Sequence, residues 1–433
     1  MSIRSLLMIK KGRIFFMLLG CIQFATNVFA DDREILTDKV FVPNIKTVQL
    51  FVEPLILTDP VIPLTGMSQL HLKFDDLDGD RKNYFYTIVL CNFDWTISEL
   101  TSFDYLSGFA EQDIHDSKYS FNTDQLYTHY DVLFPNENIR LTRSGNYIIK
   151  VYTDNDQEQT VLTKRFIVFE NKVKLLTHVT GTGDLRGENE YQQIDFTINY
   201  HGLAISNPIS EIKVLLLQNF RWDNALSNLQ PQFVKPEQLE YFSANSQFEA
   251  GKEFRTFDTR TLKYRTGRVQ SIEEKSSKII VNLLPDEIRN KQQYFYSHDN
   301  NGKFIPGILD YFDQDAQPDY VHVHFSLPVD FPFRKEKIYL IGQFNGWQLI
   351  DDYEMKYNSQ SSQYETTLFL KQGNYDYQYY FFSAEDESQS DALLLEGSDH
   401  EAENTYQLLV YYKPFGSRND QVIGYKATDT YNH

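Results

Sequence analysis

Residues 83–108 limit the fold of this chain most tightly, and they read NYFYTIVLCNFDWTISELTSFDYLSG. The first eight are mainly aromatic or β-branched, a composition typical of a β-strand. Because side chains alternate along a strand, Tyr84, Tyr86, Ile88 and Leu90 should share one face. We therefore predict the central strand of a β-sandwich, followed by an aromatic loop that either caps the core or forms a docking surface.

Segments of a similar kind recur along the rest of the chain, with turn residues between them. They include residues 46–57, 69–74, 147–153, 161–170, 193–200, 212–218, 279–284 and 320–327. Short strands separated by turn signals are typical of β-sandwiches, and a length of 433 residues suggests several domains. We predict an all-β fold with three consecutive β-sandwich domains, at residues 31–171, 172–315 and 316–433.

The N-terminus has the features of a secretory signal peptide. Basic residues precede an apolar run at residues 14–25, and small residues flank Phe29 at a cleavage signal that ends at Ala30. We expect residues 1–30 to be removed on export. The alternative is a bacterial lipobox at residues 18–21, which would make Cys21 a lipid anchor. Cleavage after Ala30 fits better because the apolar run continues beyond Cys21.

Charge and cysteine content narrow the classes of partner and site. Asp and Glu total 60 against 41 Lys and Arg, a net charge of −19. Such a surface repels nucleic acid and anionic lipid, so we expect no nucleic acid partner. Beyond Ala30 the sequence contains one cysteine, Cys91, which leaves no disulfide and no cysteine metal site in the processed chain. No later segment is apolar enough for a transmembrane helix.

No segment carries a recognisable catalytic or metal-binding motif. The acidic residues 75–80 have a calcium-loop spacing but lack the Glu that would close such a loop. His322 and His324 share one face of a strand without a third ligand at identifiable spacing. The Gly-rich residues 180–189 lack the Lys-Ser/Thr of a phosphate loop. We therefore expect no enzyme activity, no metal and no cofactor.

Residues 338–347 (IYLIGQFNGW) and 370–381 (LKQGNYDYQYYF) resemble the early-set β-sandwich of glycogen-binding type. In that family a strand ends in a Phe-Asn-x-Trp turn. In its carbohydrate-binding members the residue that corresponds to Trp347 stacks on a sugar, together with a Lys and a second Trp. Here Gln378 stands at the Lys position, and no second Trp follows Phe382. The resemblance therefore implies the fold without sugar binding.

The whole processed chain resembles the plug protein family of the type IX secretion system. The matching segments are spread over all three predicted domains. They are residues 91–95, 98, 105–108, 127–130, 135–136, 144–147, 183–186, 218–224, 396–397, 403–406, 410–412 and 422–425. The resemblance implies immunoglobulin-like or early-set sandwiches in a periplasmic protein, peripheral to the outer membrane. It also implies a partner, the outer-membrane translocon barrel, whose periplasmic opening the protein would close without catalysis.

Aromatic residues in and around the loops are the candidate contacts to this partner. They are Phe93, Trp95, Tyr105, Trp222 and Trp347. Trp and Tyr are frequent hot spots of protein interfaces, although each could instead pack on the core of its own domain. Two alternative functions stay open: an exported carbohydrate-binding β-sandwich protein, and a surface lipoprotein anchored through Cys21.

Overall fold

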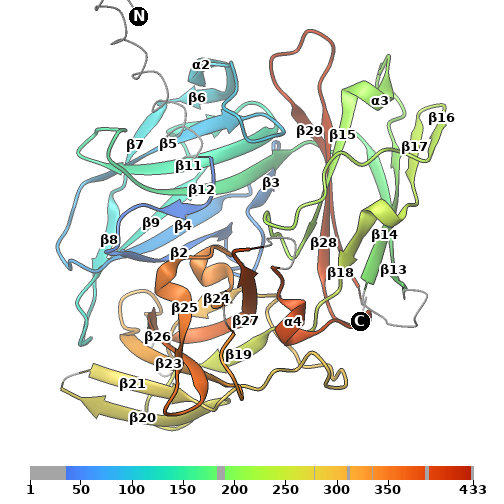
Figure 1. Ribbon diagram of the computed structural model, residues 1–433. Helices are drawn as coiled ribbons and strands as arrows, with labels where there is room; N and C mark the ends of the chain where they lie inside the picture. The colour runs from blue at the N-terminus through green and yellow to red at the C-terminus, as the bar shows by residue number, and fades with distance from the viewer. Residues whose placement is uncertain are drawn as a thin grey trace, which may run out of the picture.

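The computed structural model describes residues 36–182, 191–276, 278–309, 313–333, 335–385 and 390–430. Strands make up 48% of the structure and helices 6%, so the predicted all-β fold is confirmed as a mostly β protein. Figure 1 shows three groups of strands that meet at the centre of the molecule. The predicted signal peptide, Cys21 and the Gly-rich loop from residue 183 onward lie outside the described residues.

The first group of strands is a sandwich of a larger and a smaller sheet. The larger sheet has the order β1–β12–β11–β5–β7, and β3 lies parallel to β12. Its strands are β1 (Lys39–Val40), β3 (Val61–Pro63), β5 (Tyr84–Cys91), β7 (Glu111–Asp113), β11 (Gly145–Thr153) and β12 (Thr160–Phe169). The smaller sheet, in the order β2–β4–β9–β8, contains β2 (Ile45–Val52), β4 (Leu70–Asp76), β9 (Thr128–Phe134) and β8 (Asp116–Tyr119). We call this group the first sandwich.

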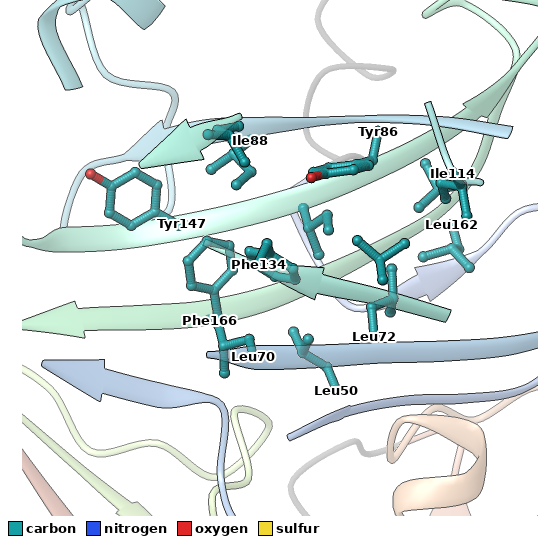
Figure 2. Packing of buried hydrophobic residues seen from close by; sticks show 14 of the residues in the cluster. Leu50, Leu70, Leu72, Tyr86, Ile88, Ile114, Phe134, Tyr147, Leu162 and Phe166 are labelled. Atoms are coloured by element: carbon teal, nitrogen blue, oxygen red, sulfur yellow. The ribbon is translucent and has the colours of Figure 1, made fainter. Parts of the chain in front are cut away.

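The core of the first sandwich confirms the alternation predicted for β5. Tyr84, Tyr86, Ile88 and Leu90 are each at most 2% exposed and belong to the cluster between the sheets. Figure 2 shows Tyr86 and Ile88 among the other labelled side chains of this core. Burying a side chain of this size stabilises the fold by about 1.5–3 kcal/mol. β5 is therefore an inner strand, held between β11 and β7.

The second group, which we call the middle unit, packs a sheet in the order β13–β14–β17–β16 against a sheet in the order β15–β28–β29. Its strands are β13 (Lys174–Thr182), β14 (Tyr191–Asn199), β15 (Ile212–Gln218), β16 (Phe233–Lys235), β17 (Gln238–Tyr241), β18 (Gln247–Glu249), β28 (Thr405–Tyr412) and β29 (Gln421–Asp429). Val214 and Leu216 face the core of this unit, whereas Leu215 and Leu217 face the first sandwich. β15 is thus apolar on both faces because both faces are buried.

The third group, in the part of the chain that the structure describes, is a nearly closed, barrel-like sheet with the order β19–β27–β24–β25–β26–β23–β21–β20. Its strands, including β22 beside β27, are β19 (Arg255–Asp258), β20 (Val269–Lys275), β21 (Lys278–Leu283), β22 (Phe304–Pro306), β23 (Tyr320–Pro328), β24 (Glu336–Ile341), β25 (Glu354–Asn358), β26 (Gln363–Lys371) and β27 (Gly373–Ser383). Its core is aromatic: the Phe257 ring lies 5.2 Å from that of Tyr375 and 5.8 Å from that of Tyr377, and the Phe325 ring lies 5.2 Å from that of Tyr377. We call this group the barrel unit.

Strand pairing crosses the limit predicted at residue 315. β19–β22 lie before that limit and pair within the barrel unit. β28 and β29 lie after it, and they extend the sheet of the middle unit, β28 next to β15 and β29 next to β28. The chain therefore leaves the middle unit, builds the barrel unit and returns (Figure 1). The division into three domains stays a prediction.

Among the residues that the structure describes, the helices are single turns in the loops. They are α2 (Ser102–Tyr105), α3 (Pro208–Glu211), α4 (Leu393–Glu396) and the 3-10 turns η1 (Ala244–Ser246), η2 (Gln343–Asn345) and η3 (Asp351–Tyr353). α2 lies next to the strand pair β6 (Leu106–Gly108) and β10 (Ile139–Leu141). Within the described residues, no helix has both the length and the apolar character needed to cross a membrane.

Candidate functional site

An aromatic joint connects the first sandwich to the middle unit, and it consists of Phe93, Trp95, Arg165, Trp222 and Tyr411. The rings of Trp95 and Trp222 meet edge to face with their centroids 4.9 Å apart. The Arg165 guanidinium lies 4.3 Å from the Trp95 ring and 5.3 Å from the Trp222 ring. Aromatic pairs and cation–π contacts each contribute about 0.5–2 kcal/mol beyond burial. Two loops distant in sequence are thus fixed to β12.

The Phe93 side of the aromatic joint connects the loop after β5 to β28. The Phe93 and Tyr411 rings are edge to face at 4.9 Å, and the Lys213 ammonium lies 5.0 Å from the Phe93 ring. The Tyr411 hydroxyl donates to Asn146 Oδ1 at 2.8 Å. These contacts attach β28 to the end of β5 and the start of β11, so the last strands of the chain also stabilise the first sandwich.

The backbone on both sides of the aromatic joint is strained. Trp95 has φ of +63°, and Asn219 and Phe220, which precede Trp222, have φ of +53° and +56°. A residue with a Cβ costs roughly 1–2 kcal/mol in this left-handed region. Such turns persist where the surrounding packing determines them. The burial of Trp95, which is 7% exposed, supplies that packing.

Trp347 forms a separate contact between the barrel unit and the middle unit. The Arg221 guanidinium lies 4.4 Å from its ring, and the Phe254 ring lies 5.6 Å away. Gly302 is required beneath it, because a Cβ at that position would lie 2.2 Å from the indole. Arg221 is the neighbour of Trp222 in the sequence, so the turn after β15 contacts both other units.

Tyr105 lies inside the first sandwich and supports α2 from below. It is 6% exposed, its ring is 6.0 Å from that of Tyr147, and its hydroxyl donates to the Ile88 carbonyl at 3.3 Å. Among the five candidate contacts, Phe93, Trp95 and Trp222 come together in the aromatic joint, while Trp347 and Tyr105 lie apart from it. That any of the five touches a partner stays a prediction.

A second, charged joint connects the first sandwich to the barrel unit through Asp75, His129, Asp315, Tyr320 and Lys371. The Asp75 carboxylate lies 2.7 Å from Lys371 Nζ, 2.6 Å from His129 Nδ1 and 2.7 Å from the Tyr320 hydroxyl. Asp75 is fully buried and Lys371 is 2% exposed. Removing one partner of such a pair costs about 3–5 kcal/mol, because the other charge is left buried and unpaired.

Electrostatics at the charged joint favour the ionised carboxylates. Burial acts to raise the pKa of Asp75, but Lys371 and His129 outweigh it and hold that pKa below its usual range. For Asp315, burial is again outweighed, by His129, Lys73 and Lys118, and the pKa falls to about 2. No local motif marks this joint, because its members come from four distant segments of the sequence.

The acidic residues 75–80 do not form an open cation site. The carboxylates of Asp76, Asp78 and Asp80 lie within 4.8 Å of one another. Lys82 Nζ is 2.8 Å from Asp76 and 3.7 Å from Asp80, and it also contacts Asp78. The ammonium thus holds the place that a metal ion would take.

The two histidines predicted to share a strand face make separate contacts. The rings of His322 and Phe369 have centroids 4.7 Å apart, and His324 Nδ1 lies 3.0 Å from the Thr367 hydroxyl. Both partners belong to β26, the neighbouring strand. These contacts are those of cross-strand pairs in a sheet.

A pair of carboxyls, half-buried Asp299 and buried Asp376, has raised pKa values. Burial raises the pKa of Asp299 to about 6, and burial together with the nearby charge of Asp299 raises that of Asp376 to about 7. Asp299 accepts hydrogen bonds from the backbone N–H groups of Phe254 and Asn301, and Asp376 accepts them from Asn300 and Gly302. The pair therefore anchors the loop before β22.

Cavities of about 320, 280 and 310 Å³ lie where the units meet. The first is between β2 and the η2–η3 segment, the second beside Trp222 and Trp347, and the third between the turn after β15 and β27. Asp299 and Asp376 line none of these cavities. The observed contacts of these two carboxyls are the hydrogen bonds that hold the loop before β22.

The aromatic joint predicts energetic coupling between Trp95 and Trp222. We expect Trp95→Ala and Trp222→Ala each to lower the free energy of unfolding by about 2–5 kcal/mol, because packing is lost. The double variant should lose less than the sum, by about 0.5–1.5 kcal/mol. Urea unfolding measures all three. The control combines Trp95→Ala with Phe325→Ala in the barrel core, where the two losses of unfolding free energy should add. If the losses also add for Trp95 and Trp222, the coupling between these two residues is refuted.

The raised pKa values of Asp299 and Asp376 predict that the folded state loses stability as the pH rises from 5 to 8. Because the folded state holds the protons of Asp299 and Asp376 more tightly than the unfolded chain does, their stabilisation is complete below about pH 4 and is lost as pH rises through 6 and 7. The thermal unfolding midpoint should therefore fall from pH 5 to pH 8. The midpoint of the Asp376→Asn variant should fall less steeply over this range. The midpoint of the control variant Asp156→Asn, at an exposed residue, should follow that of wild type. Equal slopes in all three proteins would contradict the assignment.

Comparisons with known proteins give one family match and one similar crystal structure. Residues 45–170 match the family described as the type 9 secretion system plug protein first domain. The chain is also similar to a hypothetical protein from Parabacteroides merdae, whose crystal structure superposes with a TM-score of 0.87 at 34% identity. That similarity covers 91% of this chain and 99% of the other. No curated protein matches the sequence. The chain therefore belongs to the family of type 9 secretion system plug proteins.

Proposed function

We propose that this plug protein docks on the periplasmic opening of the outer-membrane translocon barrel of the type 9 secretion system and closes it. Membership of the family gives the plug role. The periplasmic location, peripheral to the outer membrane, and the barrel as the partner are the finer parts of the proposal. The protein acts by shape and carries out no reaction.

The observation that carries the proposal is the way the units are locked together. A plug must keep its outline when a partner moves against it, so its parts must not slide past one another. The aromatic joint fixes the first sandwich to the middle unit, and the charged joint fixes it to the barrel unit. Trp347 and Arg221 connect the remaining pair of units. Each unit therefore contacts both others.

In our proposal, the five aromatic candidates contribute to partner binding indirectly, by holding the units rigid. Phe93, Trp95, Trp222 and Trp347 fix the units relative to one another, and Tyr105 supports α2. None of these roles requires the aromatic ring itself to touch the translocon. Contacts to the partner would then come from exposed side chains that the joints hold in place.

The alternative functions find less support. One face of Trp347 is covered by Arg221, so a sugar could stack on that face only if Arg221 moved, and Phe254 also packs against the ring. The lipid anchor depends on Cys21, which lies outside the described residues. An acylated Cys21 would change how the protein is attached to the membrane and would leave the plug role unaffected.

Deleting the protein from its native host tests the proposal. We expect the outer membrane to become permeable to a labelled solute too large for general porins, because the translocon is left open. Restoring the wild-type protein should reverse the leak. The matched control deletes the translocon as well, which should abolish the leak. A leak that persists without the translocon, or no leak at all, would refute the proposed closure.

A further inference from the structure

Large aromatic side chains are exposed around α2 at one end of the molecule. Phe103 is 93% exposed, Phe109 is 71% exposed and Phe415 is fully exposed. Phe103 belongs to α2, Phe109 follows β6, and Phe415 lies in the turn between β28 and β29. Exposing one such ring is common, but a group of aromatic rings on neighbouring segments marks an interaction site.

Polar contacts bring these segments together. Arg418, near Phe415, lies 4.0 Å from the carboxylate of Asp104, which follows Phe103. Arg143 Nε donates to the Asp104 carbonyl at 2.8 Å. The Phe109 N–H donates to the Asn138 carbonyl at 3.0 Å, next to the pairing of β6 with β10. Figure 1 shows the β28–β29 turn and α2 at the same end of the molecule.

The aromatic side chains stand on a rigid base. Asp104 accepts hydrogen bonds from the Thr101 N–H and hydroxyl at 2.9 Å and so caps α2. Tyr105 anchors α2 in the core. Gly108 has φ of +109°, and a Cβ there would lie 2.0 Å from the Asn138 carbonyl oxygen, so the backbone before Phe109 is closely packed. A surface that is already ordered loses little conformational entropy on binding.

The charges around the rings indicate a protein partner. Arg140, Arg143 and Arg418 are exposed there, in a chain with a net charge of −19. Aromatic residues surrounded by Arg and by mixed charges are typical of protein interfaces. Glu99 and Glu137, exposed on the adjoining segments, and Asp104 beside Arg418 offset these positive charges. The patch therefore lacks the basic excess that attracts an anionic lipid surface. The complementary surface is an apolar recess with carboxylates at its edge.

We propose that this α2 patch, made of Phe103, Phe109 and Phe415 with Arg140, Arg143 and Arg418 around them, is the surface that binds the protein partner of the plug in the type 9 secretion system. The partner presents an apolar recess edged by carboxylates. The assignment rests on the proposed function and adds the residues through which it would act.

Capture from detergent-solubilised outer membranes tests the α2 patch. A tagged chain replaces the native copy, and the amount of secretion-system protein that co-purifies with it is measured. We expect the variant Phe103→Ser, Phe109→Ser, Phe415→Ser to retain at most about a tenth of the wild-type amount, a loss typical of hot-spot aromatics. The matched control is the variant Phe233→Ser, Phe295→Ser, Phe331→Ser. These three Phe side chains are also exposed but lie on the other units, so the control variant should retain the wild-type amount.

The outcomes separate the patch from the proposed function. If the patch variant retains as much partner as wild type, the patch is wrong and the plug role survives. If the wild-type chain captures no secretion-system protein, the proposed function fails, and the patch with it. An unchanged unfolding midpoint shows that the triple variant is folded. Phe415→Ser alone, which changes only an exposed turn, is a second variant and should also reduce capture.

Two further measurements test the chemistry of the partner. The variant Arg140→Glu, Arg418→Glu should also reduce capture severalfold, since it places like charges against carboxylates; capture equal to wild type would refute the carboxylate edge. Purified protein is also mixed with vesicles of phosphatidylethanolamine and phosphatidylglycerol. We expect no flotation with the vesicles. Flotation of wild type that the Phe variant abolishes would make lipid the occupant and overturn the protein assignment.

Discussion

The packing of Trp95, Trp222 and Arg165 is the contact on which the arrangement of the units depends. It closes the space between the larger sheet of the first sandwich and β15 and β28 of the middle unit. Arg165 is a charged residue in the middle of β12, directly before the apolar residues 166–169. Burial lowers the pKa of its guanidinium although Asp38 counteracts this. Two indole rings and the Leu36 carbonyl replace the water that it loses.

Much of the fold could be predicted from local pattern. The alternation of β5, the positions of β11, β12, β15 and β23, and the turns between them follow from side-chain periodicity and turn residues. The sequence also showed that Phe93, Trp95 and Trp222 lie in loops. It could not show that they meet, because a loop aromatic that docks on a partner has the same local pattern as one that packs on a neighbouring unit.

The features that escaped prediction depend on contacts between distant segments. β15 and β28 are paired strands, but in the sequence the whole barrel unit lies between them. Their apolar runs reflect burial on both faces, and nothing in these runs indicates which strand is the partner. Asp75 and Lys371 form a buried pair, yet each looks in sequence like an ordinary surface charge. Arg165, a charged residue in the middle of β12, was the available signal for the aromatic joint.

A body whose parts are fixed through buried joints should also unfold as one. Sliding or separation of the units would expose the indoles of the aromatic joint and the ion pair of the charged joint together, at a cost of several kcal/mol. Differential scanning calorimetry of the wild-type protein measures this directly. A single transition with equal calorimetric and van't Hoff enthalpies is the predicted result. Separate transitions for the individual units would contradict the account.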